Sequence, residues 1–208
     1  MHKGRICAAA LGLTLLGACA DLPQQAQLPA TMTIAAATTT AIADGTPAVP
    51  PPGFVSFCMH NLSVCTNGKA AQPARIVLDE PTRAKLIAVN DRINNAITYA
   101  TDEAQYGVAN IWTLNAIGGY GNCKDYALAK RQALIDEGLP ESALRIAIVR
   151  TEQNELHAVL TVDTDHGDFV LDSIDPDIRP WADTRYAWLS RQSASDPLRW
   201  VSLARYER

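Results

Sequence analysis

The hydrophobic pattern changes its period near Pro140, and this change constrains the fold more than any other feature of the sequence. Before it, apolar residues at spacings of three and four predict an amphipathic helix over residues 81–100. A second helix is predicted over residues 122–137, capped by Asn122 and ended by Gly138. After Pro140, three short apolar segments rich in β-branched residues are typical of strands, at residues 144–149, 156–162 and 169–171. The sequence therefore predicts an α+β fold, with helices first and an antiparallel sheet after them.

Composition limits both the size of the domain and its class. The chain has 208 residues, of which 48% are hydrophobic and 19% charged, which suits one globular domain with a substantial core. Its net charge of −4 argues against nucleic-acid binding, because that function needs a basic face. After the N-terminus no apolar run approaches the ~20 residues of a spanning helix, so none is expected there.

Residues 1–20 have the pattern of a bacterial export signal. Basic residues precede an apolar stretch too short to span a membrane, and small residues follow it. The Leu-Gly-Ala-Cys at residues 16–19 resembles a lipobox, which predicts lipidation of Cys19 and attachment to a membrane. Ordinary cleavage at the Ala-Cys-Ala of residues 18–20 is the alternative, and it would release a soluble periplasmic protein. Either route predicts a protein of the cell envelope.

The next segment, residues 21–52, is rich in Ala, Thr, Pro and Gln and has no sustained apolar period. Such a composition predicts a disordered tether between the signal and the folded part of the chain. A single folded domain is therefore expected over residues 53–208.

Three cysteines remain once the signal is set aside: Cys58, Cys65 and Cys123. In an oxidising compartment two of three can pair, and the short separation of Cys58 and Cys65 favours a small disulfide loop between them. A metal site that includes His60 is the alternative, but it lacks a fourth ligand. Cys123 is left as the odd thiol.

Cys123 is predicted to be the first residue of a helix, behind the glycine-rich segment 118–121. A helix N-terminus favours the thiolate, which is the nucleophilic form of cysteine, and the glycines would let a substrate backbone come close. A buried structural cysteine is the competing interpretation of this position.

The parity of the predicted hairpin decides whether His157 and Asp172 can meet. A four-residue loop at 164–167 would place Asp172 opposite Val159 and on the face of His157, within reach of its side chain. A two-residue loop at 166–167 would keep the face but increase the separation, and a loop of odd length would put the two residues on opposite faces. The sequence permits this pairing without requiring it, and a satisfied core histidine remains the alternative.

If the pairing forms, Cys123, His157 and Asp172 have the residue types of a catalytic triad. The backbone N–H of Cys123 would contribute to an oxyanion hole. Trp112 and Asn115 are candidates for a second donor only because they are near in sequence.

The Gly-Asn-Cys-Lys-Asp-Tyr-Ala of residues 121–127 resembles the nucleophile motif of the bacterial transglutaminase-like cysteine peptidases, which include the LapG-type periplasmic proteases that release adhesins. Further similar segments extend the resemblance over nearly all of residues 53–202: 57–65, Val89-Asn90, Ile93-Asn94, Tyr99, Asp102, Tyr106-Gly107-Val108, Trp112, 156–160, 171–173, Pro180-Trp181, Tyr186-x-Trp188 and 191–193.

The resemblance implies a papain-like or transglutaminase-like α+β core and assigns nucleophile, base and orienting roles to Cys123, His157 and Asp172. It implies hydrolysis of a peptide bond in an envelope or surface protein through a thioester. Other acyl transfers through the same thioester are alternatives, such as amide ligation, deamidation or cleavage of a peptidoglycan peptide. A tethered lipoprotein that uses the fold only for binding is the alternative that involves no enzyme. The family analogy also admits an inner-membrane regulatory receptor as a partner.

One departure concerns a cofactor. LapG-type members bind calcium through acidic residues beside the nucleophile, and this chain has Asn122 and Lys124 there. An ammonium stands where a hard cation needs carboxylate oxygen, so we expect no calcium site and no other cofactor. Asp125 is retained and is expected either to support the site or to lie on a solvated helix face.

Overall fold

The protein is described by a computed structural model, in which residues 41–66 and 73–203 are placed well enough for a structural account. All described residues belong to one compact unit. The predicted signal, Cys19 and most of the predicted tether fall outside the described residues. Within the described ranges, no helix is long and apolar enough to cross a membrane.

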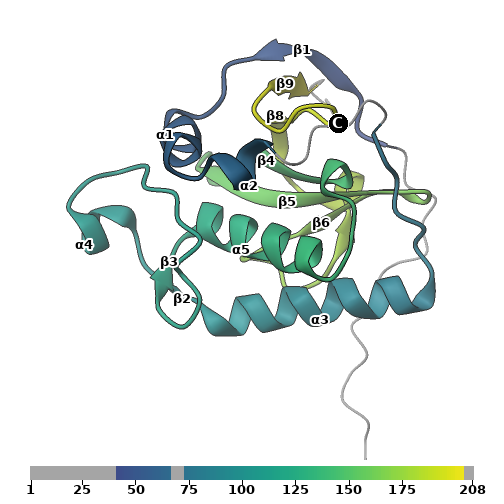
Figure 1. The fold of residues 1–208 in the computed structure, drawn as a ribbon, viewed down its shortest axis with the longest axis horizontal. Coiled ribbons are helices and arrows are strands. Elements are labelled where there is room, and N and C mark those ends of the chain that lie inside the picture. The colour runs from purple at the N-terminus through teal and green to yellow at the C-terminus, as the bar shows by residue number, and fades with distance from the viewer. Residues whose placement is uncertain (1–40, 67–72, 204–208) are drawn as a thin grey trace, which may run out of the picture. The chain divides into compact units, whose positions relative to one another are not determined.

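A seven-stranded sheet forms the centre of this unit (Figure 1). Its order is β1-β9-β8-β4-β5-β6-β7, and every neighbouring pair is antiparallel. The strands are β1 (Asp44–Ala48), β4 (Leu144–Arg150), β5 (Leu156–Thr164), β6 (Gly167–Leu171), β7 (Arg179–Pro180), β8 (Ala187–Gln192) and β9 (Trp200–Leu203). The three predicted strands are confirmed as β4, β5 and β6, and the C-terminal tail adds strands to the sheet itself.

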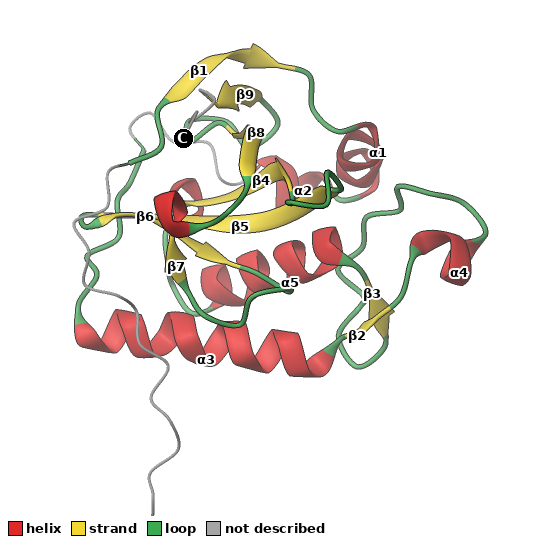
Figure 2. Cartoon of the chain, turned by 180° about the vertical axis from the view of Figure 1, so that it is seen from behind, coloured by secondary structure: helices red, strands yellow, loops and turns green. Residues whose placement is uncertain are grey.

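Helices cover one face of this sheet. The α-helices are α1 (Pro52–His60), α2 (Leu62–Thr66), α3 (Glu80–Ala96), α4 (Asp102–Tyr106) and α5 (Cys123–Asp136). Short 3-10 helices lie at Glu141–Ala143 and Trp181–Asp183, and β2 (Thr98–Tyr99) pairs in parallel with β3 (Tyr120–Gly121). Both views show α5 between β5 and α3 (Figures 1 and 2). A hydrophobic core lies along this contact. It includes Leu86, Val89 and Ile93 of α3, Leu128 and Leu134 of α5, and Ile146 and Leu160 of the sheet.

The two long helices begin where the sequence predicts, because local capping fixes their first turns. Asp79 caps α3 by accepting the N–H of Thr82 at 2.9 Å, and Asn122 is the N-cap residue of α5. The first helix ends at Ala96, four residues before the predicted end, because Ile97 is extended and leads into β2. Gly138, with a φ of 87°, allows the left-handed turn that ends the second helix.

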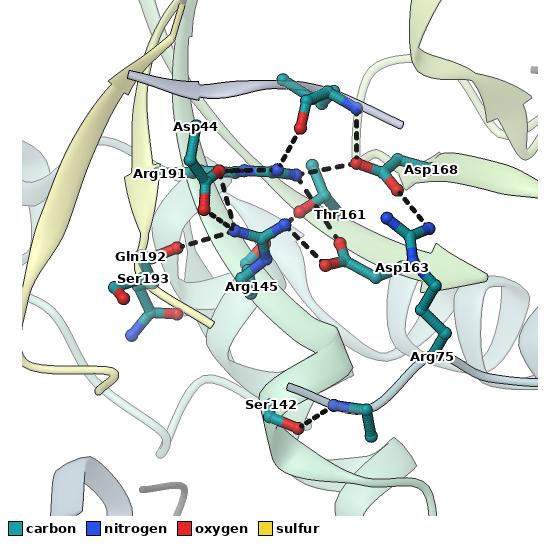
Figure 3. A network of polar contacts seen from close by, with 12 residues as sticks. Asp44, Arg75, Ser142, Arg145, Thr161, Asp163, Asp168, Arg191, Gln192 and Ser193 are labelled. Atoms are coloured by element: carbon teal, nitrogen blue, oxygen red, sulfur yellow. Dashed lines mark hydrogen bonds and ion pairs between the residues drawn. The ribbon is translucent and has the colours of Figure 1, made fainter. Parts of the chain in front are cut away.

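The domain begins earlier than predicted, so the last part of the expected tether is folded. Asp44–Ala48 forms β1 and pairs with β9 at the edge of the sheet. Its anchor is electrostatic: Asp44 lies 3.0 Å from Arg145 and 2.7 Å from Arg191, two arginines buried in the sheet (Figure 3). These partners lie 101 and 147 positions away in the sequence. The local pattern of residues 21–52 therefore does not predict β1.

The predicted disulfide is confirmed. Cys58 of α1 and Cys65 of α2 are joined, with their Cα atoms 5.7 Å apart. His60 takes no part in a metal site with them, and its Nδ1 lies 2.9 Å from the carbonyl oxygen of Ser56. The disulfide leaves Cys123 as the free cysteine of the described residues.

Candidate active site

Cys123 is the first residue of α5, as predicted, and is partly exposed. The preceding turn is fixed by Asp125, whose Oδ2 accepts the N–H of Asn122 at 3.0 Å. Gly121 is required by the close packing of this approach, since a Cβ there would lie 2.9 Å from that of Ala116 and 3.1 Å from that of Asp125. The thiol is therefore held at a helix N-terminus, where the free N–H groups favour a negative charge.

The β5–β6 hairpin places His157 and Asp172 together. Thr164 pairs with Gly167 and Leu160 with Leu171, so the register is that of the first predicted alternative. Asp172 follows directly after the last pair and lies diagonally across from His157. His157 Nε2 and Asp172 Oδ1 are 2.7 Å apart, and both side chains are buried.

His157 contacts both other members of the predicted triad. Since its Nε2 faces Asp172, the ring nitrogen that remains for the hydrogen bond with Cys123 is Nδ1. Burial lowers the pKa of His157, but the hydrogen bonds with Asp172 and Cys123 outweigh burial and raise that pKa to about 9. The site thus favours an imidazolium beside the sulfur, which is the charge arrangement that activates a thiol.

Asp172 is held from several sides. Its Oδ2 accepts a hydrogen bond from the hydroxyl of Tyr186, and its Oδ1 also accepts the N–H of Ile174 at 3.0 Å. Burial raises the pKa of Asp172, but the hydrogen bond and charge of His157 and the bond from Tyr186 lower that pKa overall. Asp172 is therefore an anion that fixes the imidazole, and Tyr186 fixes Asp172.

The backbone of Asp172 is anchored to the helices. Its carbonyl oxygen accepts hydrogen bonds from Asn94 Nδ2 of α3 at 3.0 Å and from Lys130 Nζ of α5 at 2.7 Å. Burial lowers the pKa of Lys130 to about 7, although the nearby Asp172 and Asp91 oppose this. Lys130 lies two helical turns after Cys123, so α5 carries both Cys123 and a group that positions Asp172.

A cluster of polar side chains surrounds Lys124, the residue after Cys123. Lys124 Nζ lies 2.8 Å from Asp102 Oδ1 and 2.5 Å from Asn122 Oδ1, and Asn122 Nδ2 donates to the same Asp102 oxygen at 2.8 Å. Asp125 Oδ2 is 3.8 Å from the ammonium. Sequence reasoning placed Asn122 and Lys124 beside the nucleophile but did not identify Asp102 as their partner.

The predicted supporting residues have different environments. Asp125 is completely buried, burial raises its pKa, and its Oδ1 accepts the N–H of Thr113 at 3.0 Å, so it supports the loop before α5. Trp112 is buried in the core with its ring centroid 5.5 Å from that of Phe54. Asn115 is exposed and its N–H bonds to Thr113 Oγ1. Neither of the last two placements identifies a second oxyanion donor.

Tyr186, Asn94 and Lys130 were also missed as functional residues. Tyr186 and Asn94 stand within the segments that carry the family resemblance, but their residue types alone suggest no role. Their contacts depend on the register of distant elements. A cavity of about 520 Å³ borders this side of the site and is lined by Asp172, Tyr186, Ile174, Glu152, Arg179 and Arg185, among others.

Residues 44–208 match the model of the bacterial transglutaminase-like cysteine proteinases. The chain belongs to this family. It is a cysteine peptidase with a transglutaminase-like fold, as the sequence resemblance implied. No curated protein sequence matches the peptidase.

One solved structure agrees with the family. The peptidase is similar to calcium-bound LapG of Legionella pneumophila, with 25% sequence identity and a TM-score of 0.51, over 62% of this chain and 74% of that one. It is also similar to EGTA-treated LapG of the same organism, with 24% identity and a TM-score of 0.49, over 62% and 71% of the two chains.

The residues of this chain do not fit a resident calcium ion beside Cys123. Calcium takes six to eight oxygen ligands, and here the side-chain oxygens of Asp102 and Asn122 already bind the ammonium of Lys124. Lys124 itself is 6% exposed and would repel a second cation at that place. Within the described ranges, no group of three or more His, Cys, Asp and Glu side chains is arranged to hold a metal ion.

Proposed function

We propose that the peptidase hydrolyses a peptide bond by nucleophilic catalysis with Cys123, His157 and Asp172. The observation that carries this proposal is the continuous chain of contacts from a partly exposed thiol at a helix N-terminus, through His157, to a buried carboxylate. A purely structural role would not require the sulfur to be accessible or the imidazole to be held by two partners.

The reaction follows from these positions. The Cys123 sulfur, as thiolate, attacks the carbonyl carbon, and the proton on His157 passes to the departing amine as the C–N bond breaks. The product is a thioester on Cys123. His157 then takes a proton from water as the water oxygen attacks the thioester, and breaking the C–S bond releases the acid and restores the Cys123 thiolate beside the protonated His157. The N–H of Cys123 is offered as one donor to the oxyanion.

Asp172 keeps the imidazole in the tautomer that has its free nitrogen toward the sulfur and stabilises the imidazolium that forms. Tyr186 and the anchored carbonyl of Asp172 keep this carboxylate in place. No step needs a metal ion, and the ammonium of Lys124 supports the proposal that the enzyme works without resident calcium.

The proposed substrate is a protein of the cell envelope or surface. The export signal and lipobox pattern of residues 1–20 support this location, and they support anchoring through a lipidated Cys19. The family analogy supports an inner-membrane receptor as a regulatory partner. The small disulfide between Cys58 and Cys65 is consistent with an oxidising compartment.

The test compares the surface and secreted proteins of cells with wild-type enzyme and with Cys123→Ser. A protein should lose a fragment only in the wild type, and the purified enzyme should cut that protein at the same bond. His157→Ala should abolish the cut. His166→Ala is the matched control, because His166 is an exposed histidine that pairs with Asp165. Identical surface and secreted proteins in wild type and Cys123→Ser would refute the proposal.

A further inference from the structure

Lys124 combines burial, charge and position in a way that the catalytic steps do not use. It is the second residue of α5, next to the nucleophile, and is 6% exposed. A buried ammonium is costly unless oxygens surround it. Here side-chain oxygens of Asp102 and Asn122 lie within 2.8 Å, and Asp125 Oδ2 lies at 3.8 Å.

The two carboxylates beside Lys124 each hold the same loop. Asp102 Oδ2 accepts the N–H of Ile111 at 3.0 Å, and Asp125 Oδ1 accepts the N–H of Thr113 at 3.0 Å. The loop runs from α4 to β3 and is thus bonded on both sides of Trp112. Asp125 also bonds the N–H of Asn122, directly before the nucleophile. One cluster therefore joins α4, this loop and the first turn of α5.

The cluster needs a cation. Asp102 is 4% exposed and Asp125 is completely buried, and the charge of Asp102 disfavours ionisation of Asp125. Without a positive charge between them, two neighbouring buried carboxylates would repel or one would bind a proton. Lys124 supplies that charge from within the chain.

We propose that Lys124 is a built-in cation that holds Asp102 and Asp125, and through them the loop 111–113, against the start of the nucleophile helix. Lys124 is a positioning residue: its ammonium neutralises and holds the two carboxylates, as a divalent cation would in its place. The wild-type enzyme accordingly gains nothing from calcium. Replacing the ammonium by a carboxylate creates, in contrast, a cluster of acidic oxygens that requires a cation.

The experiment measures Tm without substrate, in millimolar calcium chloride and in millimolar EGTA, for four proteins: wild type, Lys124→Met, Lys124→Glu and the control Lys85→Glu. Lys85 lies on α3 and its Nζ bonds a backbone carbonyl, that of Glu137. We expect equal Tm values for wild type in both solutions. Lys124→Met should lower Tm by about 6–15 °C in both, because it leaves buried carboxylates without their partner.

In EGTA, Lys124→Glu should have a lower Tm than Lys124→Met, and in calcium its Tm should rise by several degrees. The Tm of Lys85→Glu should be the same in calcium and in EGTA. Protection of the Ile111 and Thr113 amides from hydrogen exchange should fall in Lys124→Met and return in Lys124→Glu with calcium. A loss of packing alone would not make Tm or amide protection depend on calcium.

Three results would overturn the proposal: a wild-type Tm that rises in calcium, a Lys124→Met protein as stable as wild type, or equal calcium effects on Lys124→Glu and Lys85→Glu. If Lys124→Glu cannot be purified in either solution, Lys124→Met decides. Because the proposal rests on the proposed active site but is measured without substrate, an inactive wild type with these same Tm values would count against the catalytic function alone.

Discussion

The β5–β6 hairpin carries a buried polar cluster at each end, and the two differ in what their charges can do. At one end Asp172 faces His157, which leads to the partly exposed Cys123. At the other end Asp163 and Asp168 face arginines: Asp163 lies 2.5 Å from Arg145 and Asp168 lies 2.9 Å from Arg191. The hairpin is thus shared, while the partners of its carboxylates are not.

This contrast separates catalysis from cohesion. Histidine gains and loses a proton in the physiological range, whereas arginine remains charged, so only the first cluster can transfer protons. The arginine cluster instead binds β1 through Asp44 (Figure 3). Arg191 also donates to the carbonyl of Ile42, two residues before β1, at 2.6 Å. Changes at the first end should affect reaction rates, and changes at the second should affect stability.

The largest expected effect is the loss of the nucleophile. Cys123→Ser should reduce cleavage of the identified substrate by about 10⁴-fold or more, since removal of a nucleophile leaves only binding and oxyanion stabilisation. Its Tm should equal that of wild type. Single-turnover cleavage assays and thermal melts check both values, and appreciable cleavage by the serine variant would contradict the assignment.

Asp172→Asn should lower kcat by about 10²- to 10⁴-fold, because the amide cannot stabilise the imidazolium or fix its tautomer. The same variant should move the alkaline limb of the rate profile below pH 9, since the bond with Asp172 raises the pKa of His157. Steady-state kinetics across pH test both results. An unchanged limb would show that Asp172 does not set the protonation of His157.

Arg191→Met should lower the free energy of unfolding by about 3–5 kcal/mol, because it removes the nearest cation from buried Asp168 and one of the two arginines that hold Asp44 of β1. Activity per folded molecule should stay at the wild-type value. Urea unfolding and activity measured on the folded fraction separate the two. Arg179→Met is the matched control, as this exposed arginine pairs with Asp175 and should cost about 1 kcal/mol or less. Equal costs would remove the distinction between buried and exposed pairs.

Tyr186→Phe removes the hydrogen bond that the Tyr186 hydroxyl donates to Asp172 Oδ2. A bond to a charged group contributes about 1.5–3 kcal/mol, so kcat should fall roughly 10- to 100-fold. Tyr126→Phe is the control, because its hydroxyl bonds the carbonyl of Ile97 away from the triad. That control should change Tm and leave kcat in place. The same kcat loss in both variants would argue that Tyr186 acts through the fold alone.

The smallest expected effect is the pH dependence of stability. The pKa of His157 is raised from its ordinary 6.5 to about 9, so its contribution is complete below pH 6.5 and is lost as pH rises through 9. Relative to His157→Gln, wild type should lose about 2–3 kcal/mol of unfolding free energy over this interval. Urea unfolding across the interval measures it, and parallel curves for the two proteins would exclude the coupling.

Local signals explain which features were predictable. The helix starts at Asp79 and Asn122 follow from capping, and the nucleophile position follows from the second of them. The hairpin confined His157 to a few registers relative to Asp172, and the structure selects the one in which Thr164 pairs with Gly167. Both features are encoded within a few residues of where they occur.

Long-range contacts explain what the sequence did not reveal. Strand β1 depends on the ion pairs of Asp44 with Arg145 and Arg191. In the sequence alone, these two arginines look like ordinary surface residues. Lys130 similarly resembles a solvated helical lysine until its bond to the Asp172 carbonyl is known. A composition rich in Ala, Thr and Pro predicted disorder for the segment that includes β1. That prediction failed for β1 because the arginines that stabilise this strand come from the other half of the chain.

The most direct test of the active site needs no substrate. It compares the rate at which iodoacetamide alkylates Cys123 at pH 6 in wild type, His157→Ala and the control His166→Ala, with the modified residue located by mass spectrometry. We predict that wild type and His166→Ala react much faster than a free thiol, and that His157→Ala loses this advantage. Alkylation of wild-type Cys123 no faster than a free thiol, with no effect of His157→Ala, would contradict the proposed thiolate–imidazolium pair.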